Sequence, residues 1–366
     1  MAIRFGKEYE LLIGRATPLK DKIIPKVGGA RLISKGTNSV GVPAQDFNSV
    51  PANFMVFRDF QITAKIGQTK DQSPVNEITI TNISDDSIKR IKKDDTIILR
   101  AGYRQTSGDY LQNQSLIEDD QQPNIMVGQV IRVSTAFSGS DKVTSILCGD
   151  SVTTKKNSKI SKSYGPDTRR LAVLRDLLDL AKTQGVPIGS IRLPEEGSNG
   201  LAIINSSFLS GYTAKGNLFD EIDRFCASLE MRAYTALGKL YVEPLKTVSI
   251  KDTLLKVSTD SSNTTIVKTP LSKSAVIFTV TPENVKNTIQ PMDDNSGTAS
   301  NANDGVDKTS LKLTTYLDGR ISTDRVMRLR GFSELEYNGD YEITSVIHNL
   351  DFRGNAWDTE VTLRKL

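Results

Sequence analysis

Apolar and polar residues alternate with a period of two in many short segments of the chain. Such alternation places one side of an extended segment in a core and the other in solvent, so it predicts β-strands. The segments with this pattern, or with a short apolar run, are 9–13, 76–82, 95–100, 127–136, 142–148, 233–243, 311–317, 325–330, 341–350 and 357–363. Gly238 and the pair Gly354-Asn355 predict hairpin turns between strands. The pattern indicates a protein built mainly of antiparallel strands.

Two segments in the middle of the chain have the spacing of amphipathic helices. The first is predicted from Asp167 or Thr168 to Gln184, and the second begins near Asn217. Their apolar stripes are Leu171, Leu174, Leu178 and Ala181, and Leu218, Ile222, Phe225, Cys226 and Leu229. Because Cys226 lies within a stripe, we expect it to be a core residue and not a reactive thiol.

Three further segments lack the pattern of a regular element. Residues 15–53 are dense in Gly and Pro, and residues 291–310 contain no aromatic residue and almost nothing to bury. Residues 151–170 carry six Lys and Arg residues against Asp167 alone. We expect a loop-rich insertion at 15–53, a basic linker at 151–166 and a flexible loop at 291–310. A contact for phosphates or for an acidic partner is the alternative for the basic segment.

Two stretches of the sequence resemble each other. Residues 78–103 and 311–332 both run from alternating apolar residues through a short turn to a second strand, and both end in Leu-Arg, Gly and an aromatic residue. Gly102 matches Gly331, and Tyr103 matches Phe332 in type. Downstream, the segment that begins at Gly128 (128–133) matches in type the one that begins at Gly339 (339–346), and the segment from Asp141 (141–146) is similar to the one from Trp357 (357–361). The similarity predicts a duplication, and chance likeness of two antiparallel meanders is the alternative.

The composition limits the chemistry that the chain can perform. Among 366 residues there are one His (His348), one Trp (Trp357) and two Cys, which excludes sites built from several imidazoles or thiolates. The net charge of +4 is too small to indicate nucleic-acid or membrane binding. No apolar run is long enough to span a bilayer, and the first residues lack the apolar core of a secretion signal. We expect no cofactor, no metal site and no membrane anchor.

No catalytic constellation is evident in the sequence. Adjacent carboxylates occur at 85–86, 94–95, 118–120, 195–196 and 293–294, in turn-rich contexts that predict solvated charges and not the acid and base of a glycosidase. Neither a GxSxG elbow nor a P-loop occurs. His348 falls inside a predicted strand, where a structural role is expected. The sequence therefore predicts that the protein is not an enzyme.

Several motifs of the chain resemble those of the baseplate hub proteins of contractile-tailed phages. They are FGKEYELLIG at 5–14, ITITNIS at 78–84, ILRAGY at 98–103, LYVEP at 240–244, TIVKTP at 265–270 and HNLDFRGNAWDTE at 348–360. The last motif, with the pattern HxxDxxGxxWxTE, is the most specific. The resemblance covers most of the chain in order, except residues 15–53 and 272–310.

The resemblance implies a fold and a domain order. The expected fold is mainly β with an α+β insertion, with two similar small antiparallel β-barrels of the tube type and a middle domain that contains two amphipathic helices. The first barrel is expected at 1–150, the middle or cup domain at 167–290, and the second barrel at 311–366, open to completion by earlier strands. Three chains would then place six similar barrels beneath the hexameric tail tube and adapt it to a threefold spike.

The resemblance also implies partners and a location. It implies a homotrimer that binds the tail tube protein and the spike protein, with the tape measure protein and the baseplate wedge proteins as further candidates. Genomic DNA would only pass through the channel. The expected location is the baseplate of the virion tail, after synthesis and assembly in the host cytoplasm. The candidate residues, all structural, are Gly102, Tyr103, Gly128, Asp141, Gly331, Phe332, Gly339, Tyr341, His348, Asp351, Gly354, Trp357, Thr359 and Glu360.

Two other functions stay open on the sequence alone. One is a tail-associated enzyme that degrades peptidoglycan or glycans, and the missing acid and base argue against it. The other is a carbohydrate-binding tail protein, and the low aromatic content of 6% argues against stacking platforms for sugars.

Overall fold

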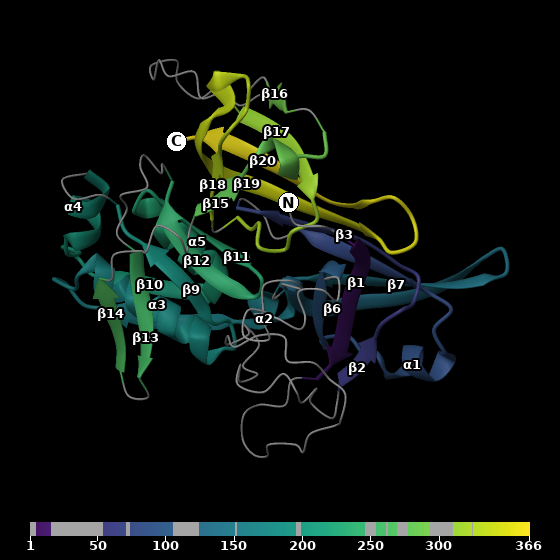
Figure 1. Cartoon of the computed structure of the whole chain (residues 1–366). Helices are drawn as coiled ribbons and strands as arrows, with labels where there is room; N and C mark the ends of the chain where they lie inside the picture. Colours follow the sequence, from purple (N-terminus) through teal and green to yellow (C-terminus); the bar gives the residue numbers. More distant parts are fainter. Residues whose placement is uncertain are drawn as a thin grey trace.

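Strands form most of the regular structure, as the alternation predicts. The computed structural model describes residues 5–15, 54–70, 74–104, 124–150, 152–194, 199–245, 254–260, 263–268, 277–287, 289–292, 310–323 and 325–366. The predicted insertion at 15–53, apart from Arg15, and residues 293–309 of the predicted loop lie outside these residues. Figure 1 shows three parts, with the first residues at the right, the middle of the chain at the left and the last residues at the top.

The first module, which we define as residues 5–150, is almost entirely β-structure. Its elements are β1 (Phe5–Gly14), β2 (Phe54–Phe57), β3 (Ile62–Thr69), β4 (Val75–Thr81), α1 (Asp85–Arg90), β5 (Thr96–Arg104), β6 (Asn124–Ser138) and β7 (Asp141–Gly149). Ser84 caps α1 through its side chain, which accepts a hydrogen bond from the N–H of Ser87, and acidic Asp85 and Asp86 occupy the first turn. Both features stabilise the start of the helix.

The second module, defined as residues 277–366, has the same kind of construction. Its elements are β15 (Ile277–Val280), the 3₁₀ turn Pro282–Asn284, β16 (Gln290–Met292), β17 (Ser310–Tyr316), β18 (Val326–Leu329), the 3₁₀ turn Leu335–Tyr337, β19 (Gly339–Asp351) and β20 (Trp357–Lys365). Strands β15 and β16 precede residue 311 in the chain and pair with β18 and β17. Earlier strands thus complete this part of the sheet.

The two modules share one continuous sheet. Its main strand order is β16-β17-β20-β19-β3-β4-β7-β6-β5-β1-β2, and β18 pairs with β19 and β15 beside this path. The modules join where β3 pairs antiparallel with β19 over seven residue pairs, from Ser345 opposite Thr69 to Asp351 opposite Thr63. The chain is therefore mainly β, with one large, mostly antiparallel sheet, and the helices lie chiefly in the middle part.

The modules repeat the same strand order. The order β3-β4-β7-β6-β5 in the first corresponds to β16-β17-β20-β19-β18 in the second, and every neighbouring pair in both series is antiparallel. Strands β6 and β19 also carry a bulge at the same place, between Val130 and Arg132 opposite β7 and between Ile343 and Ser345 opposite β20. The two similar stretches of sequence therefore belong to modules of the same strand order, as a duplication predicts. One pairing differs, because β1 joins β5 antiparallel whereas β15 joins β18 in parallel.

The bulges fix the residue equivalence and correct the alignment made from sequence. Arg132 is equivalent to Ser345 because each is the first paired residue after its bulge. Gly128, which the sequence comparison matches to Gly339, is therefore equivalent to Tyr341. Similar turn residues mislead the sequence comparison by two positions, whereas strand register is set by the bulge.

The middle part, defined as residues 152–268, contains the longer helices. Its elements are α2 (Val152–Asn157), β8 (Lys159–Tyr164), α3 (Arg170–Thr183), β9 (Ile188–Arg192), α4 (Asn199–Asn205), β10 (Tyr212–Asn217), α5 (Leu218–Ser228), β11 (Met231–Ala236), β12 (Lys239–Pro244), β13 (Leu254–Asp260) and β14 (Asn263–Lys268). The two predicted helices are confirmed as α3 and α5. The predicted hairpin at Gly238 is confirmed as β11 and β12, joined through Leu237 and Gly238, both with positive φ.

The segment 151–166, expected to be a basic linker, instead contains α2 and β8. Strand β8 pairs antiparallel with β10 over six residue pairs. Ile160 is the buried residue of this strand, while its Lys and Ser side chains are exposed. A two-stranded ribbon needs few apolar residues, so a composition dominated by Lys and Ser is compatible with it.

Buried side chains form one main cluster in each part. The first module encloses a core that includes Phe57 of β2 and Ile62 of β3, at opposite ends of its strand order, so its sheet curls around a common interior. The second module has its own core around Met327 and Val361. In the middle part, α3 and α5 pack against the sheet of β9, β11 and β12, and Cys226 is buried among them as expected.

Candidate functional site: the junction between the modules

The residues of the HxxDxxGxxWxTE motif gather where the second module meets the first. Trp357 is 2% exposed and belongs to the core of the first module, although β20 is a strand of the second. Its indole N–H donates a hydrogen bond of 3.1 Å to the carbonyl oxygen of Gly102 on β5. The hydroxyl of Tyr103 donates in return to the carbonyl oxygen of Trp357, at 3.1 Å. Three of the predicted residues therefore lock the two modules together.

Lys7 of β1 reinforces the same contact. Its ammonium donates hydrogen bonds to the carbonyl oxygens of Asp351 and Gly354, with 2.8 Å to Asp351, and lies 5.5 Å from the centre of the Trp357 ring. Loss of solvent lowers the pKa of this ammonium, and the nearby Asp351 carboxylate partly opposes that effect. The sequence pattern did not indicate Lys7, because nothing in β1 marks it as a neighbour of the last hairpin.

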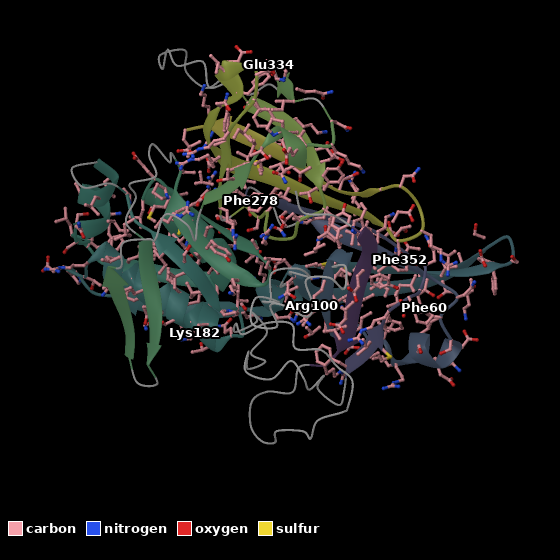
Figure 2. The ribbon with its side chains drawn as sticks, viewed as in Figure 1. Phe60, Arg100, Lys182, Phe278, Glu334 and Phe352 are labelled. Atoms are coloured by element: carbon pink, nitrogen blue, oxygen red, sulfur yellow. The ribbon has the colours of Figure 1, made fainter. Side chains whose placement is uncertain are left out.

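The turn between β19 and β20 is organised by Asp351. Its carboxylate accepts the N–H of Gly354 at 2.8 Å and the side-chain amide of Gln61 at 3.1 Å. A Cβ atom on Gly354 would lie 1.9 Å from this carboxylate, so a larger residue there would displace the Asp351 side chain from its hydrogen bonds. Phe352 packs from the same turn onto Tyr9, with ring centres 4.9 Å apart, near Phe60 (Figure 2). The turn is thus held by the first module.

His348 lies in the centre of the junction. It is opposite Ile66 of β3 on one side and Thr359 of β20 on the other, and its Nδ1 is 3.0 Å from the Thr359 hydroxyl. The side chain is fully buried, and burial lowers its pKa from 6.5 to about 4. His348 is therefore neutral at neutral pH and part of the packed junction.

Glu360, the last residue of the motif, lies on the outer side of β20. It accepts a hydrogen bond of 2.8 Å from the Asn349 side chain and forms an ion pair of 3.0 Å with Lys312. Burial opposes ionisation, but these donors outweigh it and lower the carboxyl pKa. Glu360 therefore ties β17, β19 and β20 together within the second module.

The remaining predicted residues lie apart from this junction and stabilise single modules. Gly128 faces the carbonyl of Gly149, where a Cβ would approach to 2.4 Å, and Asp141 accepts a hydrogen bond of 2.8 Å from Asn82. In the second module, Gly331 has φ +79°, Gly339 has φ +153°, and Phe332 and Tyr341 are core residues. The Tyr341 hydroxyl donates to the carbonyl oxygen of Tyr337 at 3.0 Å.

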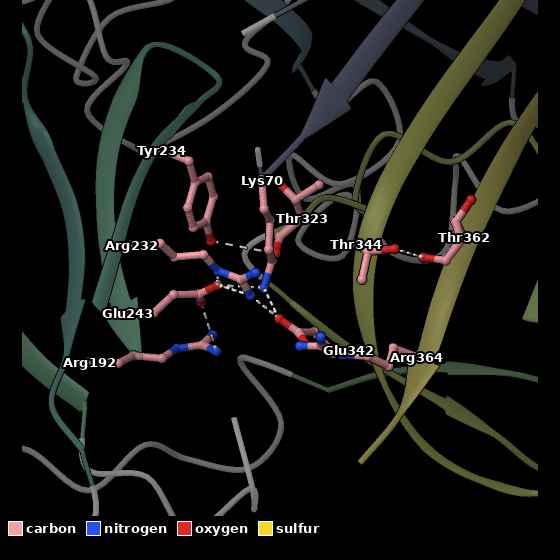
Figure 3. Close-up of polar contacts among 10 residues, drawn as sticks. All are labelled: Lys70, Arg192, Arg232, Tyr234, Glu243, Thr323, Glu342, Thr344, Thr362 and Arg364. Atoms are coloured by element: carbon pink, nitrogen blue, oxygen red, sulfur yellow. Dashed lines mark hydrogen bonds and ion pairs between the residues drawn. The ribbon is translucent and has the colours of Figure 1, made fainter. Parts of the chain in front are cut away.

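A buried ionic cluster, which the sequence pattern did not indicate, joins all three parts of the chain (Figure 3). Lys70, which follows β3, lies 2.7 Å from Glu243 of β12 and 2.8 Å from Glu342 of β19. Arg232 of β11 contacts both carboxylates as well. Outer members are Arg192, 3.5 Å from Glu243, and Arg364, which pairs with Glu342.

The charges of this cluster depend on one another. Lys70, Glu243 and Glu342 have side chains no more than 3% exposed, so each would be costly to bury alone. Burial opposes ionisation of Glu342, yet Lys70 and Arg232 outweigh it and lower its pKa to about 2. One sequence signal could have indicated this cluster: a charged residue next to apolar residues of a predicted strand, as Glu243 is in LYVEP at 240–244.

The described acidic and thiol groups have structural surroundings. Among the described residues, no group of three His, Cys, Asp or Glu side chains is placed to hold a metal ion. Asp85 and Asp86 occupy a helix N-terminus, and Asp95 accepts hydrogen bonds from Arg15 and from the N–H of Lys92. Burial raises the pKa of the Cys148 thiol to about 12 and also raises that of Cys226. No helix in the described part of the chain is long and apolar enough to cross a membrane.

The fold is similar to solved structures of tail proteins. The tail protein from Neisseria meningitidis MC58 superimposes with a TM-score of 0.50, at 9% identity, over 99% of this chain and 97% of that chain. The 43 kDa tail protein of prophage MuSo2 from Shewanella oneidensis gives 0.51, at 9% identity, over 98% of both chains. No protein-family model and no curated protein matches the sequence. Over nearly its whole length, the chain has the fold of these tail proteins.

Proposed function

We propose that this chain is a structural hub at the tip of a contractile phage tail, a trimer that adapts a threefold spike to the hexameric tail tube. The observation that carries the proposal is the duplication, in which two modules of equal strand order are fused side by side through β3 and β19. Three such chains would present six similar docking units, as a hexameric tube requires. The fold shared with tail proteins supports a structural tail role.

In this proposal the first module, within residues 1–150, and the second module are tube-type domains. The middle part is the cup that grips the spike, and the ionic cluster holds it rigidly against both modules. The tape measure and wedge proteins are further partners, and genomic DNA passes only through the central channel. The protein acts in the virion tail, after assembly in the host cytoplasm, and needs no cofactor or catalytic site.

The test is assembly with the spike and tube proteins of the same virus. We expect light scattering to give the mass of three chains and electron microscopy to show a ring that binds the end of the tube. A chain that stays monomeric with the spike present and does not bind the tube contradicts the proposal. So does hydrolysis of peptidoglycan by the purified chain, if one Glu or Asp substitution abolishes it.

A further inference from the structure

The contact between the two modules uses one edge of β19 and one edge of β3. Residues 345–350 of β19 pair with β20 on one side, and residues 345–351 pair with β3 on the other. At the end of this stretch, Leu350 is 2% exposed and lies opposite Ala64, within the core of the first module. The contact therefore combines strand pairing with burial of an apolar side chain.

The equivalent stretch of the first module is residues 132–138 of β6. It pairs with β7, and no described strand pairs with its other edge. Coverage on that edge stops at Val130, whose N–H and C=O bond to the backbone of Asp95 and Asp94 at 2.8 Å. Beyond it, residues 134–138 are exposed and form the hairpin that projects at the right of Figure 1.

The side chain at the equivalent of Leu350 is Phe137. Both lie five residues after the first paired residue beyond the bulge, Arg132 or Ser345. Phe137 is 77% exposed, whereas Leu350 is buried by the neighbouring module. A strand edge without a described partner is a site for strand addition, and burial of a large aromatic side chain beside it would favour such a contact.

The equivalent of β3 in the second module is β16. Glu77 of β4 and Lys312 of β17 are equivalent, because they lie opposite the equivalent residues Leu147 and Thr362. Lys65 lies opposite Glu77, and Gln290 lies opposite Lys312, so Lys65 and Gln290 are equivalent as well. Strand β16 ends the sheet among the described strands, so its outer edge has no described partner. The chain thus has two strand edges without a described partner strand: residues 132–138 of β6, and the outer edge of β16.

We propose that residues 134–136 of β6 pair with β16 (Gln290–Met292) of a second copy of this chain, as the equivalent residues 347–349 pair with β3 within one chain, and that Phe137, the next residue, is buried in that contact. The two edges belong to different modules, so the contact is head-to-tail and closes into a ring or extends as a filament. The closed, three-copy form rests on the proposed hub function. Pro291 has no N–H, so β16 offers fewer donors than β3, and the contact depends on the buried side chain as well.

A disulfide trap tests the register of this contact directly. Ala136 is equivalent to Asn349, and Gln290 is equivalent to Lys65. Because Asn349 lies opposite Lys65, the proposal places Ala136 of one copy opposite Gln290 of the next. Directly opposed residues on antiparallel strands have Cα atoms about 4.5–5.5 Å apart, which a disulfide can bridge. Cys148 and Cys226 are buried and do not compete. Oxidation of the full-length Ala136→Cys, Gln290→Cys variant should give covalent species of two and three chains.

The matched control pairs Ala136→Cys with Leu209→Cys, since Leu209 is 92% exposed on the middle part. This control should stay at the mass of one chain. A second measurement uses Phe137→Asp, which should weaken assembly about tenfold or more, while Leu209→Asp assembles like the unmodified chain.

The outcomes separate this inference from the hub proposal. If the unmodified chain assembles but the double cysteine variant stays monomeric after oxidation and Phe137→Asp assembles normally, the inference is wrong and the hub proposal stands. If the trap succeeds but yields open chains of many lengths and no closed trimer, the contact stands and the trimeric hub is wrong. Equal cross-linking in the control pair would also overturn the inference.

Discussion

The indole N–H of Trp357 donates a hydrogen bond to the carbonyl oxygen of Gly102, across 255 positions of sequence. The donor belongs to the last strand of the second module and the acceptor to β5 of the first. Trp357 therefore joins the two modules: it belongs to a strand of the second module, and its side chain is buried in the core of the first. The function proposed for the chain requires this joint to be rigid.

Replacement of Trp357 by Phe should destabilise the protein by about 1–3 kcal/mol, because the buried carbonyl of Gly102 loses its donor while most apolar contact is kept. Urea unfolding followed by circular dichroism measures this loss. Trp357→Ala should cost more, about 3–5 kcal/mol, since it also leaves a cavity. Equal stability of the Phe variant and the unmodified protein would show that the hydrogen bond contributes nothing.

Replacement of Lys70 by Met should cost about 3–5 kcal/mol, because Glu243 and Glu342 are left buried with less positive charge. Lys65→Met on the adjoining strand β3 is the matched control, since Lys65 is exposed and should change stability by about 0.5 kcal/mol or less. Thermal unfolding compares the two. A Lys70 variant as stable as the Lys65 variant would mean that Arg232 alone holds the cluster.

Stability should fall as the pH is lowered from 6.5 toward 4, because of His348. Its pKa is about 4 in the folded protein and near 6.5 when unfolded, so the unfolded chain binds the proton first. The expected loss is about 1.4 kcal/mol per pH unit within this window.

His348→Gln should lose most of this dependence, as measured by urea unfolding at pH 7 and pH 5. The chain has a single His, so no second imidazole contributes. Burial raises the pKa of Asp223, which acts in the opposite direction and is the same in both proteins. Parallel pH profiles for the two proteins would contradict the assignment to His348.

Replacement of Gly354 by Ala should destabilise the hairpin turn by about 1–3 kcal/mol, because the added methyl group meets the Asp351 carboxylate. Gly165→Ala is the control, since a Cβ there has no atom within 4 Å. Hydrogen exchange at residues 350–358 should accelerate in the first variant and not in the second. Unchanged exchange in both would show that the turn adjusts without cost.

The local elements of this protein follow from its sequence alone. Alternation with period two predicts the strands, helical spacing predicts α3 and α5, and the N-cap residues Ser84 and Asn217 mark helix starts, because these signals depend on neighbours in sequence. The sequence also indicates the duplication and the structural roles of His348 and Trp357. It placed residues 151–166 in a linker, because a ribbon with few buried side chains has no clear pattern.

The way the parts meet follows only from the tertiary structure. The residue equivalence of the two modules depends on the bulges in β6 and β19, and a bulge leaves no reliable mark in sequence. The burial of Trp357 in the other module, and the convergence of Lys70, Arg232 and Glu342, bring together residues that are far apart in the sequence. Such contacts depend on the packing of the whole chain, so no local pattern specifies them.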